Sequence, residues 1–272
     1  MDRVPLRFTE EVLLQLEMEE SKRRNLKRKL QAIRTLASIW SGIANRPRKY
    51  ANLKIYFDPH EVVFYLESDR KPVALEDLGS IVIDEFLISD NRPRDGLHCD
   101  PLTESSLKQL KKLLRRGNPC ELSVYCRNEH PLLQQLCLAP ARVTKLKCFY
   151  FPITCREEVF VRILERRTLG SFAFWRETFL TPELLRLLLA FLPTREFHHL
   201  SIAVTTDSSV SIQTLTNELI DTVLSMEGRR RCIFWAGGRN FQLCSRRFGD
   251  GVQSNVRLMY ENESHYVAVC FT

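Results

Sequence analysis

The sequence predicts a mixed α/β chain, in which a small helical region over residues 1–50 precedes a β-α repeat over residues 51–272. Two patterns predict this class. Apolar residues recur at steps of three and four before residue 50, and strand-like and helix-like stretches alternate after it. With 44% hydrophobic residues in 272, the chain can bury a full core and has room for a small second domain.

The region before residue 50 contains two predicted helical segments between Phe8 and Ile43. The first has a plausible N-cap in Thr9, followed by two glutamates that suit the positive end of a helix dipole. Pro47 ends the second segment. The apolar stripes are Val12, Leu13 and Leu16 in the first segment, and Leu26, Leu30, Ile33, Leu36, Trp40 and Ile43 in the second.

A basic run lies between these two stripes. Residues 22–34 carry seven cations and no acid, which equals the formal charge of +7 for the whole chain, so the remainder is neutral. A protein that wraps a polyanion spreads its cations over the groove, so a local run argues against a chain-wide nucleic-acid surface. Two interpretations of the basic run remain. It can be a single basic arm, or it can be a solvated helix face whose cations pair in part with Glu19 and Glu20.

After residue 50 the pattern begins with a hairpin and then alternates. Residues 52–57 and 61–66 are strand-like and are joined by a turn at Asp58-Pro59-His60. From residue 121 onward, successive strands start roughly 22 to 34 residues apart, a spacing at which each strand and its helix form one unit. The later predicted strands are 81–88, 121–126, 143–151, 169–175, 197–204 and 231–236, and the helices are 102–116, 131–138, 156–167, 181–192 and 211–226.

Two architectures fit this alternation: a curved β-α solenoid resembling leucine-rich repeats, and a doubly wound sheet with helices on both faces. Strands buried on both faces would be apolar throughout, whereas these alternate, as in Leu200, Ile202 and Val204. An open sheet face favours the solenoid. The tail (241–248, 256–260 and 265–271) predicts antiparallel strands that cap the last repeat.

The alternation also predicts an exposed strip on the open face. If Leu122, Val124, Cys126, Leu146, Cys148, Phe172 and Phe174 point into the core, their alternating neighbours face outward. Large aromatic residues there could anchor a bound partner, although the tail or a long loop could also bury them. The predicted substrate-binding residues are Tyr125, Lys147, Phe149, Trp175 and His199.

The sequence contains none of the common catalytic or phosphate-binding motifs, so we predict no enzyme activity, no cofactor and no metal. The nine cysteines include no C-x-x-C pair and fit buried thiols in a reducing compartment. No secretory signal precedes them, and the longest apolar run, near Leu184–Leu192, is too short for a bilayer and is broken by Arg186. We therefore expect a soluble cytoplasmic or nuclear protein with no membrane partner.

The N-terminal segments resemble an F-box. The resemblance lies in VPLRFTEEVLLQL (Val4 to Leu16) and LQAIRTLASIWSGIA (Leu30 to Ala44): a Pro-Leu start, a helix with paired apolar residues, and a second helix ending in tryptophan. The opening and the β-α units behind it are similar to nematode F-box proteins with a leucine-rich-repeat-like or F-box-associated C-terminal domain. The motif covers about the first 45 residues, and only architecture supports the rest.

The resemblance implies a substrate-recognition adaptor of an SCF-type E3 ubiquitin ligase, acting in ubiquitin-mediated proteolysis. Its helices would bind the Skp adaptor, a cullin subunit would complete the complex, and the repeat domain would bind a protein substrate. Such an adaptor catalyses nothing itself and contributes proximity. The residues implied at the Skp contact are Val4, Pro5, Leu6, Val12, Leu13, Leu16, Leu30, Ile33, Leu36 and Trp40.

One feature departs from the family. The two helical pieces of an F-box are joined by a short turn, whereas here Met18 to Lys29 lengthens the gap and carries the cations. The alternative function is therefore a nuclear or nucleic-acid-associated interaction protein that uses residues 22–29 as a localisation signal or phosphate-binding arm. An enzyme of unknown type is a more distant third hypothesis.

Overall fold

The computed structural model describes residues 49–58, 61–66, 81–91, 100–194, 196–226, 232–248, 256–261 and 266–271. The two predicted helical segments, the basic run and all ten residues of the predicted Skp contact lie outside these ranges. Within them the chain is mixed α/β, which confirms the predicted class.

The chain divides into two compact units. The first comprises Met1–Leu87, Asn91–Cys120 and Ala139–Arg142, and the second comprises Ile88–Asp90, Glu121–Leu138 and Val143–Thr272. Each unit is described separately below.

The first unit is built on the predicted hairpin. Strands β1 (Lys49–Asp58) and β2 (Glu61–Leu66) pair antiparallel, and the strand order is β3-β1-β2-β4, with β3 at Ile81–Asn91 and β4 at Asp100–Pro101. Helix α4 (Glu104–Leu114) begins with a capping box, in which the Ser106 backbone N–H donates to the Thr103 hydroxyl at 3.1 Å. Its buried leucines, including Leu110, lie on one face.

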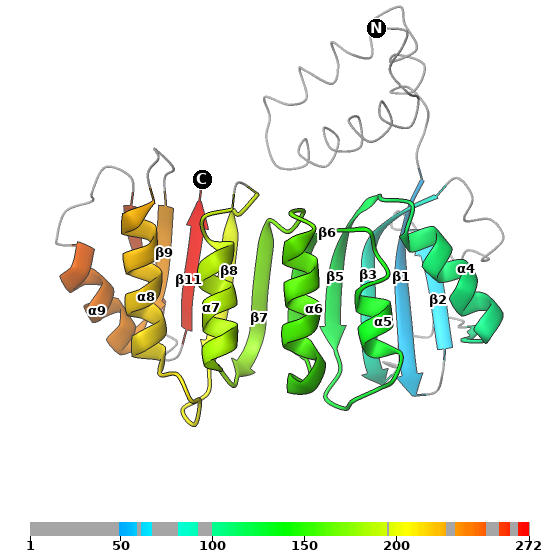
Figure 1. Ribbon diagram of the computed structural model, residues 1–272, viewed down its shortest axis with the longest axis horizontal. Coiled ribbons are helices and arrows are strands. Elements are labelled where there is room, and N and C mark those ends of the chain that lie inside the picture. The colour runs from blue at the N-terminus through cyan, green and yellow to red at the C-terminus, as the bar shows by residue number, and fades with distance from the viewer. Residues whose placement is uncertain are drawn as a thin grey trace, which may run out of the picture. The chain divides into compact units, whose positions relative to one another are not determined.

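The second unit contains the repeated β-α pattern. Its strand order is β10-β9-β11-β8-β7-β6-β5; β7 pairs in parallel with β6 and with β8, whereas β8 pairs antiparallel with β11 on its other side. From β6 to β8 each crossover moves to the next position in the same direction, and right-handed crossovers then place the helices on one side. Figure 1 shows α6, α7 and α8 in front of these strands. The elements are β5 (Pro119–Tyr125), α5 (Leu133–Cys137), β6 (Arg142–Tyr150), α6 (Ile153–Glu165), β7 (Ser171–Thr178), α7 (Pro182–Phe191), β8 (His199–Val204), α8 (Ile212–Ser225), β9 (Cys232–Gly237), α9 (Gly238–Phe248), β10 (Val256–Glu261) and β11 (Tyr266–Phe271).

The helices of the second unit start where the sequence supplies a cap. The Thr181 hydroxyl accepts from the Leu184 backbone N–H at 3.1 Å before α7, and Pro182 fits the first turn. The Ser211 hydroxyl caps α8 in the same way by accepting from Thr214 N–H at 3.0 Å. Each cap satisfies a backbone donor that has no partner inside the helix.

The prediction for the tail is wrong in part. Residues 241–248 belong to helix α9, and β10 pairs with β9 in parallel. The buried residues Asn240 and Cys244 lie four positions apart, a helical spacing, and Phe241 contacts Tyr260 of β10 edge-to-face. Strand β11 is antiparallel as predicted, but it lies between β8 and β9 instead of capping the sheet edge.

The predicted alternation is present in the strands. All seven residues expected to face the core, from Leu122 to Phe174, are buried. In β8 the buried residues Leu200, Ile202 and Val204 alternate with partly exposed ones. The helices therefore cover one face of the strands, and the other face carries the candidate functional residues.

Candidate protein-interaction surface

Three of the predicted residues form one stack of aromatic rings at the ends of neighbouring strands. The ring centroids of Tyr125 and Phe149 are 3.9 Å apart with an interplanar angle of 15°. Those of Phe149 and Trp175 are 5.7 Å apart at 7°. Adjacent strands lie about 4.8 Å apart, so side chains at matching positions stack. We call Tyr125, Phe149 and Trp175 the aromatic ladder.

An irregularity in the pairing of β7 with β8 lies at the exposed end of the aromatic ladder. The parallel register between β7 and β8 shifts between Ala173 and Glu177, and Trp175 lies inside that irregularity. Irregular pairing can redirect the side chains of a strand, and here Trp175 is 58% exposed while the next two residues are exposed as well. An exposed tryptophan beside two partly exposed rings is a composition typical of interface hot spots.

The ring geometry limits what the ladder can bind. Phe149 is stacked on both sides, so its faces are covered and its edge remains available. Base binding by single-strand proteins requires open ring faces, whereas apolar side chains and backbone of a protein can pack on ring edges. The central ring therefore offers its edge but no face to a partner, whereas Trp175 ends the stack and is 58% exposed.

Lys147 lies on the same face of β6 as Phe149 and is paired with an acid. The Glu121 carboxylate contacts both Lys147 and Lys145, the latter at 3.0 Å. Burial raises the pKa of Glu121, but hydrogen bonds from Lys147 and Lys145 outweigh it, and the net pKa lies below its ordinary value. Two ammonium groups therefore share one ionised carboxylate.

His199 lies apart from the ladder. The register aligns Lys145 with Ser171 and Ser171 with His199, so His199 is level with a residue four positions before Phe149, about 13 Å along the strand. The Ser171 Oγ lies 3.2 Å from His199 Nδ1, and burial lowers the pKa of His199. Among the described residues no carboxylate pairs with His199, so the acid of a Ser-His-acid triad is missing there.

Sequence reasoning missed a group formed by Arg127, Tyr150 and Arg176 at the ends of the same three strands. Arg127 Nη2 donates to the Tyr150 hydroxyl at 2.8 Å, and the Arg127 Cζ lies 4.1 Å from the ring centroid. The Arg176 Cζ lies 5.8 Å from the same centroid. The sequence does hold one clue to this group, because each of the three residues follows a ladder residue by one or two positions.

Other groups in the described part of the chain offer little chemistry. No cluster of three or more histidines, cysteines or acids suited to a metal occurs among those residues. Burial raises the pKa of Cys126, Cys137 and Cys148, and raises that of Cys244 to about 12, so these thiols are protonated and unreactive at neutral pH.

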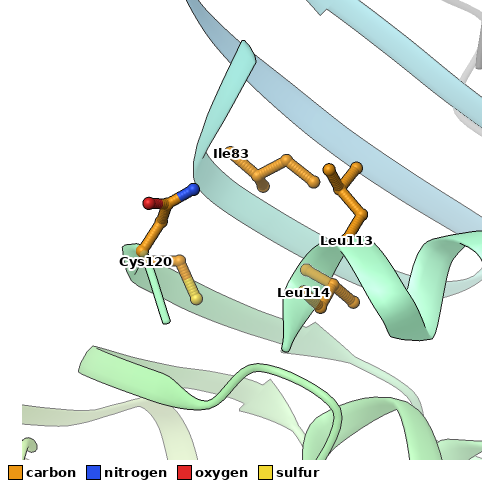
Figure 2. Close-up of a pocket in the computed structure, with 5 residues that line it drawn as sticks. Ile83, Leu113, Leu114 and Cys120 are labelled. Carbon is orange, nitrogen blue, oxygen red and sulfur yellow. The ribbon is translucent and has the colours of Figure 1, made fainter. Parts of the chain in front are cut away.

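The described part of the first unit has a small pocket lined by residues of α4 and β3 and of the segment that follows α4 (Figure 2). Ile83, Leu113, Leu114 and Cys120 line it, and Asn118 supplies its one side-chain amide. This lining lacks the charged or convergent polar groups that orient a small ligand.

Comparisons with protein-family models, curated proteins and solved structures found no match for this chain. Among the helices that the structure describes, none combines the length and apolar character needed to cross a bilayer.

Proposed function

We propose that the protein is a substrate-recognition adaptor of an SCF-type E3 ubiquitin ligase. The observation that carries the proposal is the aromatic ladder, in which the exposed Trp175 stacks with the partly exposed rings of Phe149 and Tyr125. The F-box resemblance of the N-terminal sequence supplies the link to the ligase. In this proposal the ladder contacts the substrate and the chain performs no chemistry of its own.

The arrangement of the second unit supports a curved solenoid resembling leucine-rich repeats over a doubly wound sheet. Strands β6, β7 and β8 follow one another in sequence order, and their helices lie on one side (Figure 1). A doubly wound sheet reverses its strand order at a switch point and places helices on both faces. A solenoid leaves a continuous sheet surface for a partner.

The proposed adaptor acts by proximity. In this proposal Skp links the chain to the cullin subunit. The residues that would bind Skp are Val4, Pro5, Leu6, Val12, Leu13, Leu16, Leu30, Ile33, Leu36 and Trp40. A substrate held on the second unit would then present its lysines to the ubiquitin-loaded enzyme. We expect this to occur in the cytoplasm, the nucleus or both.

Affinity purification of the full chain followed by mass spectrometry tests the proposal. We expect Skp and cullin subunits to co-purify, and expect Leu13→Asp combined with Leu36→Asp to remove them. Phe149→Ala combined with Trp175→Ala should keep Skp and cullin while removing the substrate. If the wild-type chain is folded and neither Skp nor cullin is recovered, the adaptor proposal is wrong.

The alternative function rests on the cations of residues 22–29. A nucleic-acid arm predicts affinity for an oligonucleotide that falls steeply as salt rises and vanishes when these cations are neutralised. An adaptor predicts no such dependence.

A further inference from the structure

We propose that β10, the outermost strand of the second unit, pairs antiparallel with β10 of a second copy of this chain. The pairing is centred on Met259, so position 257 of each copy lies opposite position 261 of the other. The result is a symmetric homodimer in which the two sheets join edge to edge. This dimer uses neither the N-terminal segments nor the aromatic ladder, so it is independent of the proposed function.

The outer side of β10 is available for pairing in the described part of the chain. In the strand order of the sheet, β10 has β9 on one side and no described strand on the other. It pairs with β9 in parallel over all six of its residues, Val256–Glu261, in one continuous register. A strand that is paired on one side only presents a row of backbone N–H and C=O groups to a further strand.

The sequence of β10 lacks most of the features that protect a sheet edge from pairing. Natural edge strands are often blunted by proline, by bulges, by lysine or by short length. Strand β10 is as long as its neighbour β9, and its sequence VRLMYE contains no proline, glycine or lysine. Its two charged residues have opposite signs, so their arrangement decides which strand can pair with it.

These charges are complementary to themselves in one antiparallel register. When two copies pair about Met259, positions 257 and 261 lie directly opposite each other, and residues that are directly opposite share one face of the sheet. The sequence places Arg257 and Glu261 at these positions, so the dimer contains two pairs of opposite charge. A parallel pairing in register would place like charges side by side, which is unfavourable. Arg257 is exposed, and none of the described ion pairs includes it.

The apolar residues of β10 also match in this register. Leu258 of one copy lies opposite Tyr260 of the other, and the two-fold axis repeats this pair. Tyr260 contacts Phe241 of α9 edge-to-face, with ring centroids 5.2 Å apart, yet it remains 55% exposed. Pairing places a leucine beside this exposed ring, and the burial of apolar surface stabilises association.

The small size of the interface sets the strength that we expect. One strand of six residues from each copy buries much less than the roughly 1,600 Å² of a standard protein interface, and contacts of this size are weak. The dimer should therefore be reversible and should dissociate on dilution.

Sedimentation velocity of the purified full chain over a concentration series tests the dimer. We expect a shift from monomer to dimer as the concentration rises. Arg257→Glu places acids opposite acids in both pairs and should raise the dissociation constant about tenfold or more. Glu261→Arg should have the same effect by placing arginines opposite arginines, and circular dichroism should show both variants folded.

Exchange of the two charges separates loss of pairing from damage to the fold. The double variant, Arg257→Glu with Glu261→Arg, restores the opposite charges and should dimerise like the wild type. An equimolar mixture of the two single variants should form a heterodimer, because each variant supplies the charge that the other lacks. The matched control is Arg162→Glu, at an exposed arginine of α6 that pairs with Glu158, and it should leave the dimer unchanged.

Three results would overturn the inference. A wild-type chain that sediments as a monomer at every concentration up to about 100 μM would show that this edge does not pair with a second copy. A dimer of equal strength in Arg257→Glu would place the interface elsewhere. A dimer that is lost in both single variants and recovered in neither the double variant nor the mixture would show that charge pairing along β10 does not hold it. Recovery or loss of Skp in the adaptor test changes none of these outcomes.

Discussion

The second unit contains two groups of aromatic rings that differ in burial and in geometry. On the helix side, Phe160 and Phe172 stack at 4.3 Å, while Phe160 and Phe191 meet edge-to-face at 77°. On the open side, the aromatic ladder is stacked throughout, at 15° and 7°. The core rings pack in three dimensions between strands and helices, whereas the ladder has neighbours only along the sheet.

The difference teaches that contact between rings does not reveal their role. Phe172 and Trp175 lie on the same strand, yet Phe172 is 1% exposed and Trp175 is 58% exposed. The first ring removes its whole surface from water and stabilises the fold. The second leaves more than half of its surface exposed, so it is available for the substrate contact proposed above.

The largest expected effect is the difference in stability loss between alanine substitutions of these two rings. Phe172→Ala should lower the free energy of unfolding by roughly 3–5 kcal/mol, because it leaves a cavity in the core. Trp175→Ala should lower it by less than about 1.5 kcal/mol, the range for one aromatic pair. Urea unfolding followed by circular dichroism measures both, and equal losses would contradict the division between core and ladder.

A second comparison concerns two arginines near the same end of β7. Arg156 is 2% exposed, and its Nη1 and Nη2 donate to the Thr178 hydroxyl at 2.6 Å and to the Phe179 carbonyl at 3.0 Å. Arg156→Met leaves that carbonyl without a donor and should destabilise the protein by about 1–3 kcal/mol. Arg176→Met, at an exposed site, should change stability by about 0.5 kcal/mol or less. A large loss of stability in both variants would show that Arg176 helps to hold the fold together.

The ion pairs of Glu121 on the open face should contribute less to stability than the buried groups above. Glu121→Gln should lower stability at neutral pH by less than about 1 kcal/mol, since the lysine partners are partly exposed. The pKa of Glu121 is lowered in the folded state, so its contribution is present above the unfolded pKa and is lost as pH falls through the folded pKa. Denaturation curves of wild type and Glu121→Gln should therefore converge below about pH 4. A difference in stability between the two proteins that persists in acid would show that the ionised Glu121 carboxylate is not its source.

The smallest effect concerns His199. Burial lowers its pKa in the folded state, so below the ordinary pKa of about 6.5 the unfolded chain binds a proton more readily than the folded chain. Stability should fall as pH drops from 7 to about 5. The loss should be smaller in His199→Gln, as measured by thermal unfolding across that range. An identical pH dependence in both proteins would show that His199 is not the group responsible.

Much of the fold could be predicted from the sequence because its periodicities are clear. The hydrophobic period of two in β8 and the caps at Thr181 and Ser211 fixed element type and position. Helix α9 was missed because Phe241, Leu243 and Ser245 suggest alternation, while the helical pair of Asn240 and Cys244 includes a polar member.

The candidate site was predictable only in part. Alternation identified Tyr125, Phe149 and Trp175 as neighbours, because matching positions on adjacent strands stack. It could not place Arg127 over Tyr150, since that contact depends on the path of the loop after β5. Nor could it predict the irregular pairing in β7, which depends on how β7 and β8 align.

The position of β11 has a consequence for the order of folding during synthesis. Strands β8 and β9 are separated in the sheet by β11, whose residues are made after both of them and after β10. Until residues 266–271 leave the ribosome, β8 and β9 each present an edge with unpaired backbone groups. Slow translation between β9 and β11 would prolong that exposure, and we expect a chaperone to bind this end of the sheet until β11 is inserted.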